Sequence, residues 1–175
     1  KIASAYRGFD RQALIWNSKF LGKTPILNKD NQVVKSHMLS GVELCEAILL
    51  FSAMPGASRH HYGTDLDIFD ANALLDGKKL HLEPWEYQKN GPFYKLSLWL
   101  DKHIADYGFF KPYAKYTGGI AHEPWHISHQ KTATELLNSH SKNSITDALQ
   151  SSSVEGKQCL IDFYLKQLFL LQIYI

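Results

Sequence analysis

The chain has 175 residues, a length typical of one domain with a substantial hydrophobic core. Hydrophobic residues make up 45% and charged residues 21%, which excludes a disordered or collagen-like chain. Lys and Arg number 19 against 17 for Asp and Glu, and this even balance argues against a nucleic-acid-binding surface or a polybasic membrane patch.

The first 39 residues predict a strand, a helix and a loop. The pattern of residues 1–6 is typical of a strand. A helix is expected to follow with Asp10 as its N-cap, because apolar residues then recur at helical spacing, and to end at Gly22. Residues 23–39 are polar and predict a loop.

A second helix, a strand and a turn are expected after this loop. Ser40 and Glu43 predict a capping box at the start of the helix, and apolar residues after them share one face. Residues 64–69 alternate between polar and apolar and predict a short strand. Asp76 and Gly77 lie between leucines and predict a hairpin turn.

The second half of the chain predicts more helix than strand. Pro92 is expected in the first turn of a third helix, which Gly108 ends. Residues 120–128 are a candidate strand, although they contain Pro124. The chain then closes with helical patterns at residues 132–139, 143–150 and 154–175.

Strands and helices are therefore mixed without a regular βαβ order, which predicts the α+β class: a small antiparallel sheet flanked by helices, with a helical C-terminus. No repeat or low-complexity linker divides the sequence, so we expect a single domain over residues 1–175. Because the chain begins within a strand pattern and stops within a helix pattern, we expect further residues at both ends.

The last apolar segment, residues 159–175, is interrupted by charged and amide side chains, so it predicts a buried helix and no membrane span. The N-terminus shows no signal-peptide pattern. Cys45 and Cys159 have no cysteine nearby, which excludes a Cys-rich zinc site. Two buried thiols are the default, and one disulfide between them stays open for an exported protein.

Two segments concentrate residues with catalytic potential: 58–67 and 122–129. The second contains the pattern H-E-x-x-H, which on a helix would place two histidines on one face as zinc ligands. Pro124 occupies the third position of this pattern, where it would cost a helix about 3 kcal/mol. We therefore reject a helical ligand pair formed by His122 and His126.

An alternative is a metal site shared between the two segments. A catalytic zinc ion needs three nitrogen or oxygen ligands and one open position, and His60, Asp67 and His126 could supply them. Seven residues of plain strand would separate the first two too widely, so Gly63 would have to turn the chain back. Glu123 would then lie close enough to act as a general base.

From spacing alone, a purely structural interpretation is favoured over the metal site at this point. Histidines beside aromatic residues are common in cores and on surfaces, and Asp65 and Asp67 could belong to a turn and a solvated face. Motif matches of this kind carry a substantial risk of coincidence.

The residues resemble the zinc D-alanyl-D-alanine carboxypeptidases of the VanY and LdcB type, which are related to the vancomycin-resistance D,D-dipeptidases. Three separated elements carry the resemblance, in the order that the family has them, and together they span positions 4 to 126. The matching residues are Ser4, Tyr6, Arg7 and Gln12, then Ser58, His60, Gly63 and Asp67, then Glu123, Trp125 and His126.

The resemblance implies one zinc ion held by His60, Asp67 and His126. It implies Glu123 as the catalytic base and Arg7 as the cation that stabilises the developing oxyanion. An ion pair with Asp10 at the strand end is the structural alternative for that arginine.

Three further residues are expected at the substrate: the resemblance implies Ser58 and Gln12, and Trp125 is a candidate for the cleft wall. The sequence departs from the family pattern at Gly8, where a serine is usual, and at Asp65, where a small residue is usual. A turn cap is the simplest role for this extra carboxylate, but orienting a metal ligand or meeting a substrate amine stays open.

The implied activity is hydrolysis of a peptide bond next to a D-amino acid in a peptidoglycan stem peptide, foremost as a D-Ala-D-Ala carboxypeptidase. An L,D-carboxypeptidase, an endopeptidase and a non-catalytic peptidoglycan-binding module are the alternatives. The implied substrate predicts export to the periplasm or cell envelope, and the sequence gives no indication of the oligomeric state.

Overall fold

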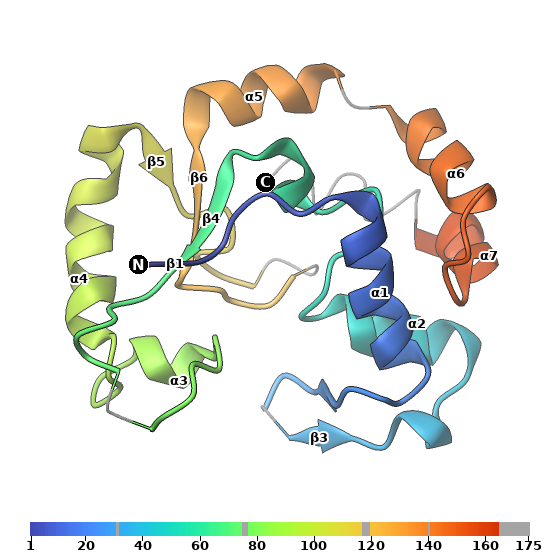
Figure 1. Cartoon of the computed structure of the whole chain (residues 1–175), viewed down its shortest axis with the longest axis horizontal. Coiled ribbons are helices and arrows are strands. Elements are labelled where there is room, and N and C mark those ends of the chain that lie inside the picture. Colours follow the sequence, from blue (N-terminus) through green and yellow to red (C-terminus); the bar gives the residue numbers. More distant parts are fainter. Residues whose placement is uncertain (31, 75–76, 117–119, 140, 165–175) are drawn as a thin grey trace.

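The computed structural model describes residues 1–30, 32–74, 77–116, 120–139 and 141–164 (Figure 1). The strands are β1 (Ile2–Ser4), β2 (Ile26–Leu27), β3 (Val33–Val34), β4 (Asp65–Ile68), β5 (Phe109–Phe110) and β6 (His126–His129). The α-helices are α1 (Phe9–Phe20), α2 (Gly41–Leu49), α3 (Pro84–Tyr87), α4 (Tyr94–His103), α5 (Gln130–Ser139), α6 (Lys142–Gln150) and α7 (Lys157–Cys159). Short helical turns cover Ser36–Met38 (η1), Arg59–Tyr62 (η2), Ile104–Tyr107 (η3) and Leu160–Tyr164 (η4).

The fold is α+β, as the sequence predicts, and its centre is an antiparallel sheet of four strands in the order β1-β4-β6-β5. The two central strands, β4 and β6, come from distant parts of the chain: Asp65 in β4 pairs with Ser128 in β6, 63 positions further along. In this register Asp67 lies directly opposite His126. Cross-strand partners project from the same face of a sheet, so the pairing brings these two side chains together.

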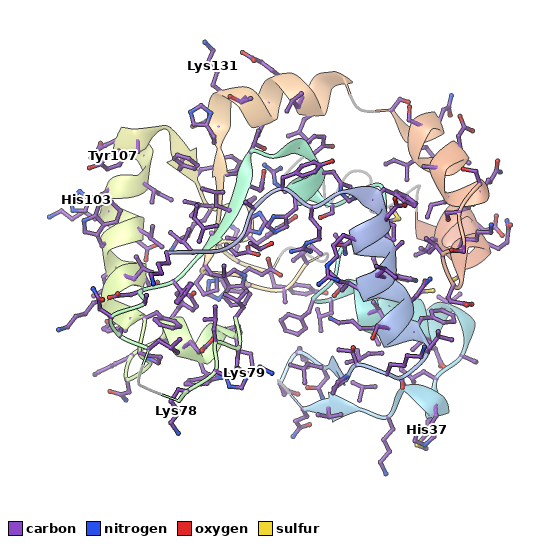
Figure 2. All side chains as sticks on the ribbon, viewed as in Figure 1. His37, Lys78, Lys79, His103, Tyr107 and Lys131 are labelled. Atoms are coloured by element: carbon purple, nitrogen blue, oxygen red, sulfur yellow. The ribbon has the colours of Figure 1, made fainter. Side chains whose placement is uncertain are left out.

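The helices form two groups around the sheet (Figure 1). α4 lies along one side next to β5, whereas α1 and α2 lie on the other side with α6 and α7 beyond them, and α5 joins the two groups. Figure 2 shows His103 and Tyr107 at the outer surface of the first group, pointing away from the sheet.

The larger hydrophobic core lies in the second group of helices. α1 and α2 contribute their apolar faces to it, as the periodicity predicts, and the C-terminal helices cover it. Its central members are Trp16, Cys45, Ile48, Met54, Ile145, Leu149, Val154 and Leu160. The Trp16 indole N–H also donates to the Glu155 carbonyl, which ties the first helix to the C-terminal segment. A smaller core of Tyr87, Phe93 and Trp125 lies beneath α3 and α4.

The N-termini of α1 and α2 differ in detail from those predicted from the sequence. The N-cap of α1 is Gly8, and Asp10 lies in the first turn, where a carboxylate faces the positive end of the helix dipole. Ser40 is the N-cap of α2, but its side chain forms no cap. The Glu43 amide donates to the Ser40 backbone carbonyl instead, so the predicted capping box is wrong.

Several strands and helix limits in the structure also differ from those predicted from the sequence. The predicted loop 23–39 contains the β2–β3 hairpin, and only β6 forms within the predicted strand 120–128. The third helix begins at Tyr94, after Pro92, and the turn at Gly108 follows as predicted, with a φ of 76°. Of the predicted hairpin turn, Asp76 lies outside the described residues, and Gly77 has a φ of 74° with no strand described on either side of it.

The C-terminal helices at 132–139 and 143–150 are confirmed as α5 and α6. Of the helix predicted over 154–175, α7 and η4 are described, and residues 165–175 lie outside the described part. No helix within the described ranges is both long and apolar enough to cross a membrane. Cys45 and Cys159 are free thiols, and both contact the larger core.

Candidate metal centre

Two neighbouring strands and one helical turn supply the three predicted metal ligands. Asp67 in β4 and His126 at the start of β6 are paired across the sheet, and Oδ1 of the first lies 3.1 Å from Nδ1 of the second. His60 lies in η2, immediately before β4, and its Nε2 is 3.2 Å from Asp67 Oδ2. One ligand atom from each of the three residues lies within 4.8 Å of the other two.

Gly63 makes this arrangement possible, as the sequence analysis requires. It follows η2 with a φ of 71°, in the left-handed region that residues with a Cβ rarely adopt. The chain therefore reverses between the helical turn and β4, and His60 returns to the level of Asp67 in the sheet. The H-E-x-x-H segment is not helical: His122 and Glu123 precede the strand that His126 begins.

In each of the two imidazole rings, the nitrogen that points away from Asp67 (the far nitrogen) has its own partner. The nitrogen that faces Asp67 (the near nitrogen) is therefore left for a metal. His60 Nδ1 lies 2.8 Å from the Ala5 carbonyl, and His126 Nε2 lies 2.7 Å from Asp65 Oδ1. Each partner is a hydrogen-bond acceptor, so the far nitrogen is the protonated one when the imidazole is neutral.

Two atoms that face each other inside the ligand group have no hydrogen-bond partner. Asp67 Oδ1 and His126 Nδ1 are buried, and neither has a hydrogen-bond partner. Buried polar atoms without partners are rare in proteins, and a bound cation would satisfy both. The donor set of two imidazoles and one carboxylate fits zinc.

Asp65 lies directly behind this group and forms the most extensive polar contacts of the site. Its carboxylate is fully buried and accepts hydrogen bonds from Arg59 Nε at 2.8 Å and Thr64 Oγ1 at 2.7 Å. Ser128 Oγ donates at 3.0 Å to Oδ2, the oxygen that Thr64 also contacts. Of the three roles that the sequence leaves open for Asp65, the structure favours the orientation of a ligand, His126.

The electrostatics of the two aspartates follow from these contacts. Burial alone would raise the pKa of Asp65, but the hydrogen bond from His126 and the positive charge of Arg59 outweigh it and hold that pKa well below its usual range. Burial alone would raise the pKa of Asp67 too, but the attraction of the His126 and His60 rings beside it outweighs burial and lowers that pKa below its usual range. Both carboxylates are therefore ionised at neutral pH.

Glu123 lies beside the three ligands, where a base would be needed. Its Oε2 is 3.5 Å from His126 Nδ1, and its backbone amide donates to the Tyr113 carbonyl at 3.1 Å. Burial raises the pKa of Glu123 to about 7, although attraction to His126 opposes the rise. A carboxylate with this pKa can accept a proton and release it again near neutral pH.

Arg7 approaches the group from the turn between β1 and α1. Its Nη2 lies 4.0 Å from Asp67 Oδ2 and donates to Ser4 Oγ at 2.9 Å. Nη1 donates to Gln12 Oε1 at 2.8 Å, and the Gln12 amide in turn donates to the Ala53 carbonyl at 2.6 Å. Gln12 is fully buried next to Arg7, and it is not among the residues that line the cavity over the ligand group.

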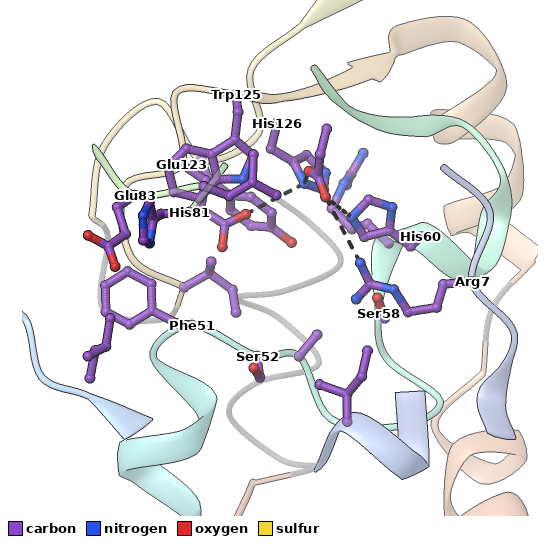
Figure 3. A pocket seen from close by; sticks show the side chains of 18 of the residues that line it. Arg7, Phe51, Ser52, Ser58, His60, His81, Glu83, Glu123, Trp125 and His126 are labelled. Carbon is purple, nitrogen blue, oxygen red and sulfur yellow. Dashed lines mark ion pairs between the residues drawn. The ribbon is translucent and has the colours of Figure 1, made fainter. Parts of the chain in front are cut away.

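A cavity of about 320 Å³ opens over the three ligands (Figure 3). Arg7 and His60 lie on one side of it, Glu123 and Trp125 on another, and Ser52 faces them from the segment after α2. The cavity lining also includes Ser58, Lys19 and Tyr113. Of the three expected substrate contacts, Ser58 and Trp125 therefore lie at the cavity.

The remaining histidines of the two segments lie outside the ligand group. His61 Nδ1 contacts the Arg7 carbonyl, and its Nε2 accepts from the Gly56 amide at 3.1 Å, so it supports the loop that carries the arginine. His129 contacts Thr132 in α5. Arg59 and Lys19 were not predicted as site residues, because each is a single basic residue without a motif of its own.

Comparison with known proteins gives one family and several relatives. The family model described as VanY, D-alanyl-D-alanine carboxypeptidase, matches residues 1–132. An uncharacterised protein of Haemophilus influenzae is 38% identical over 115 residues, which cover 65% of this chain and 87% of the relative. A second uncharacterised protein of the same organism is 40% identical over 52 residues, which cover 30% of this chain and 36% of that protein.

Solved structures with a similar fold are also found. A mutant of the vancomycin-resistance D,D-pentapeptidase VanY in complex with Zn(II) shares 20% identity and a TM-score of 0.48, over 91% of this chain and 70% of that one. The LdcB LD-carboxypeptidase shares 26% identity and a TM-score of 0.44, over 78% of this chain and 56% of that one.

Proposed function

Because this chain belongs to the VanY family of D-alanyl-D-alanine carboxypeptidases, we propose that it is a zinc-dependent peptidase that cleaves peptidoglycan stem peptides next to a D-amino acid. The observation that carries the proposal is the buried group of His60, Asp67 and His126 with Glu123 beside it. These three side chains would hold one zinc ion, which would act as a Lewis acid on the scissile carbonyl and on a water molecule.

Glu123 is the general base and acid of the proposed reaction. Its carboxylate takes a proton from the water whose oxygen attacks the scissile carbonyl carbon, and it gives that proton to the amine nitrogen when the C–N bond breaks. The pKa of about 7, which burial produces, suits both transfers.

Arg7 supplies the fixed positive charge of the site. Ser4 and Gln12 hold its guanidinium in one orientation, so little reorganisation is needed when negative charge develops on the carbonyl oxygen. We therefore assign Gln12 to positioning this cation, and we assign Ser58 and Trp125 to the substrate peptide. The alternative ion pair between Arg7 and Asp10 is not formed among the described residues, where the ion-pair contact of Arg7 is with Asp67.

We further propose a D-Ala-D-Ala carboxypeptidase activity outside the cytoplasm, where peptidoglycan stem peptides occur. The test is mass spectrometry of pentapeptide and tetrapeptide stems after incubation with the zinc-loaded protein, with and without a chelator. We expect loss of one D-alanine from the pentapeptide, which the chelator abolishes and added zinc restores. Loss of the last residue of the tetrapeptide would indicate L,D specificity, and absence of any cleavage would overturn the proposal.

A further inference from the structure

Lys19 is a cation in the cavity wall without an acidic partner. It lies in the last turn of α1, and its Nζ donates to Ser52 Oγ at 2.6 Å. No carboxylate among residues 1–30, 32–74, 77–116, 120–139 and 141–164 forms an ion pair with it. An ammonium group donates up to three hydrogen bonds, so donors remain beyond the one that Ser52 accepts.

The acids that share this cavity are already engaged. Asp67 belongs to the ligand group, and Glu123 lies 3.5 Å from His126. Glu83 accepts from the Trp85 indole N–H at 2.6 Å and caps α3. None of them lies within ion-pair distance of Lys19, so its ammonium has no direct acidic partner among the described residues that line the cavity.

Lys19 is partly buried, which makes a charge without a direct partner less favourable there than in open solvent. Removal from water lowers the pKa of Lys19, and Glu123 opposes that effect while Arg7 adds to it. A position at the C-terminal end of α1 favours a cation, but it gives no reason for the side chain to reach the cavity. A ligand with a carboxylate would supply the missing partner.

We propose that Lys19, together with Ser52, binds the free C-terminal carboxylate of the substrate. This inference rests on the proposed peptidase function and refines it: the enzyme removes a terminal residue and does not cut within a peptide. In a carboxypeptidase substrate the terminal carboxylate is separated from the scissile carbonyl by one residue, so both groups must lie in one cavity.

The two cations then have separate tasks. Arg7 lies 4.0 Å from Asp67, next to the ligand group, where the carbonyl oxygen would acquire negative charge. Lys19 lies on the Ser52 side of the same cavity. An internal peptide bond would place a neutral amide there and leave the ammonium unpaired, which disfavours such substrates.

The test compares two acyl-D-Ala-D-Ala peptides that differ only in a free C-terminal carboxylate or a carboxamide. We expect the zinc-loaded wild-type protein to prefer the free acid. In Lys19→Met, kcat/KM for the acid should fall about 10- to 100-fold, mainly through KM, with little change for the amide. Lys19→Arg should restore part of the preference, and Lys23→Met, at an exposed site near the end of α1, should leave it unchanged.

Binding provides a second measurement that does not depend on turnover. D-Ala-D-Ala and its amide are titrated into the wild-type and Lys19→Met proteins, after thermal unfolding and zinc content have shown that the variant is folded. Weaker binding of the acid alone in the variant supports the proposal. Equal treatment of acid and amide by the wild-type protein, or an unchanged preference in the variant, would overturn it. Absence of cleavage with an intact binding preference would instead overturn the peptidase function.

Discussion

His126 Nε2 lies 2.7 Å from Asp65 Oδ1, on the side of the imidazole ring opposite to the nitrogen that faces Asp67. The ring is therefore held from behind by a carboxylate, which Arg59 holds in turn through a contact of 2.8 Å. Such partners orient a metal-binding imidazole and raise its basicity. This arrangement leads to one prediction for Asp65 and one for Arg59.

Asp65→Asn should weaken zinc binding about 10- to 100-fold, because the charge that fixes the orientation and basicity of His126 is lost. Competition titration with a chromophoric chelator measures the affinity directly. Asp70→Asn is the matched control, since this carboxylate follows β4 and, within the described part of the chain, accepts a hydrogen bond only from the Asn72 amide. Equal zinc affinities of Asp65→Asn and the wild-type protein would show that Asp65 does not support the metal group.

Arg59→Met should lower the free energy of unfolding of the metal-free protein by about 3–5 kcal/mol. Both members of the Arg59–Asp65 pair are fully buried, so removal of the cation leaves a buried carboxylate without its main partner. Urea denaturation measures the loss. The exposed Arg11→Met variant should unfold like the wild-type protein. A loss below about 1 kcal/mol in Arg59→Met would contradict the prediction.

Glu123→Gln should retain zinc but lose turnover, by a factor of about 100 to 10,000, since the amide keeps the shape of the side chain but cannot accept the proton. Rates with the pentapeptide stem and zinc content are measured on the same preparation. Glu135→Gln, at an exposed site in α5, serves as the control. Turnover at the wild-type rate in Glu123→Gln would rule out its role as the base.

Zinc binding should release protons at neutral pH. In the metal-free protein burial alone would lower the pKa of His126, but the carboxylates of Asp65 and Asp67 raise it to about 9. His126 is then positively charged below this pH, and an ion that binds at its near nitrogen must displace a proton. We expect release of about one proton at pH 7 and tighter binding as the pH rises. Calorimetric titrations of zinc in buffers of different ionisation enthalpy measure the number of protons released. Binding heats that do not depend on the buffer would contradict the predicted proton release.

Long, periodic elements were predictable from the sequence, and very short ones were not. The apolar periodicity around Trp16 and Ile48 identified α1 and α2, because each helix must bury one face. β3 and β5 contain two residues each, which is too few for an alternating pattern to be recognised. The strand predicted over 120–128 reached too far back because Pro124 removes a backbone donor, and pairing begins only at His126.

Within the site, the residues of the spaced motif could be predicted from the sequence. The residues that contact and orient them could not. His60, Gly63 and Asp67 form a pattern in which every position has a geometric reason. Arg59 acquires a partner only after η2 meets β4 and β6, and Lys19 reaches the cavity only through the packing of α1 against the segment after α2. These contacts join parts of the chain that no local pattern connects.

The pairing of β4 with β6 also has a consequence for the order of events during synthesis. His60 and Asp67 leave the ribosome early, whereas the strand that carries His126 follows only after the whole α3–β5 segment. The nascent chain therefore has no complete binding site until β6 has joined the sheet. Metal binding through all three ligands therefore follows the pairing of β4 with β6, in contrast to small zinc domains whose ligands lie close together in sequence.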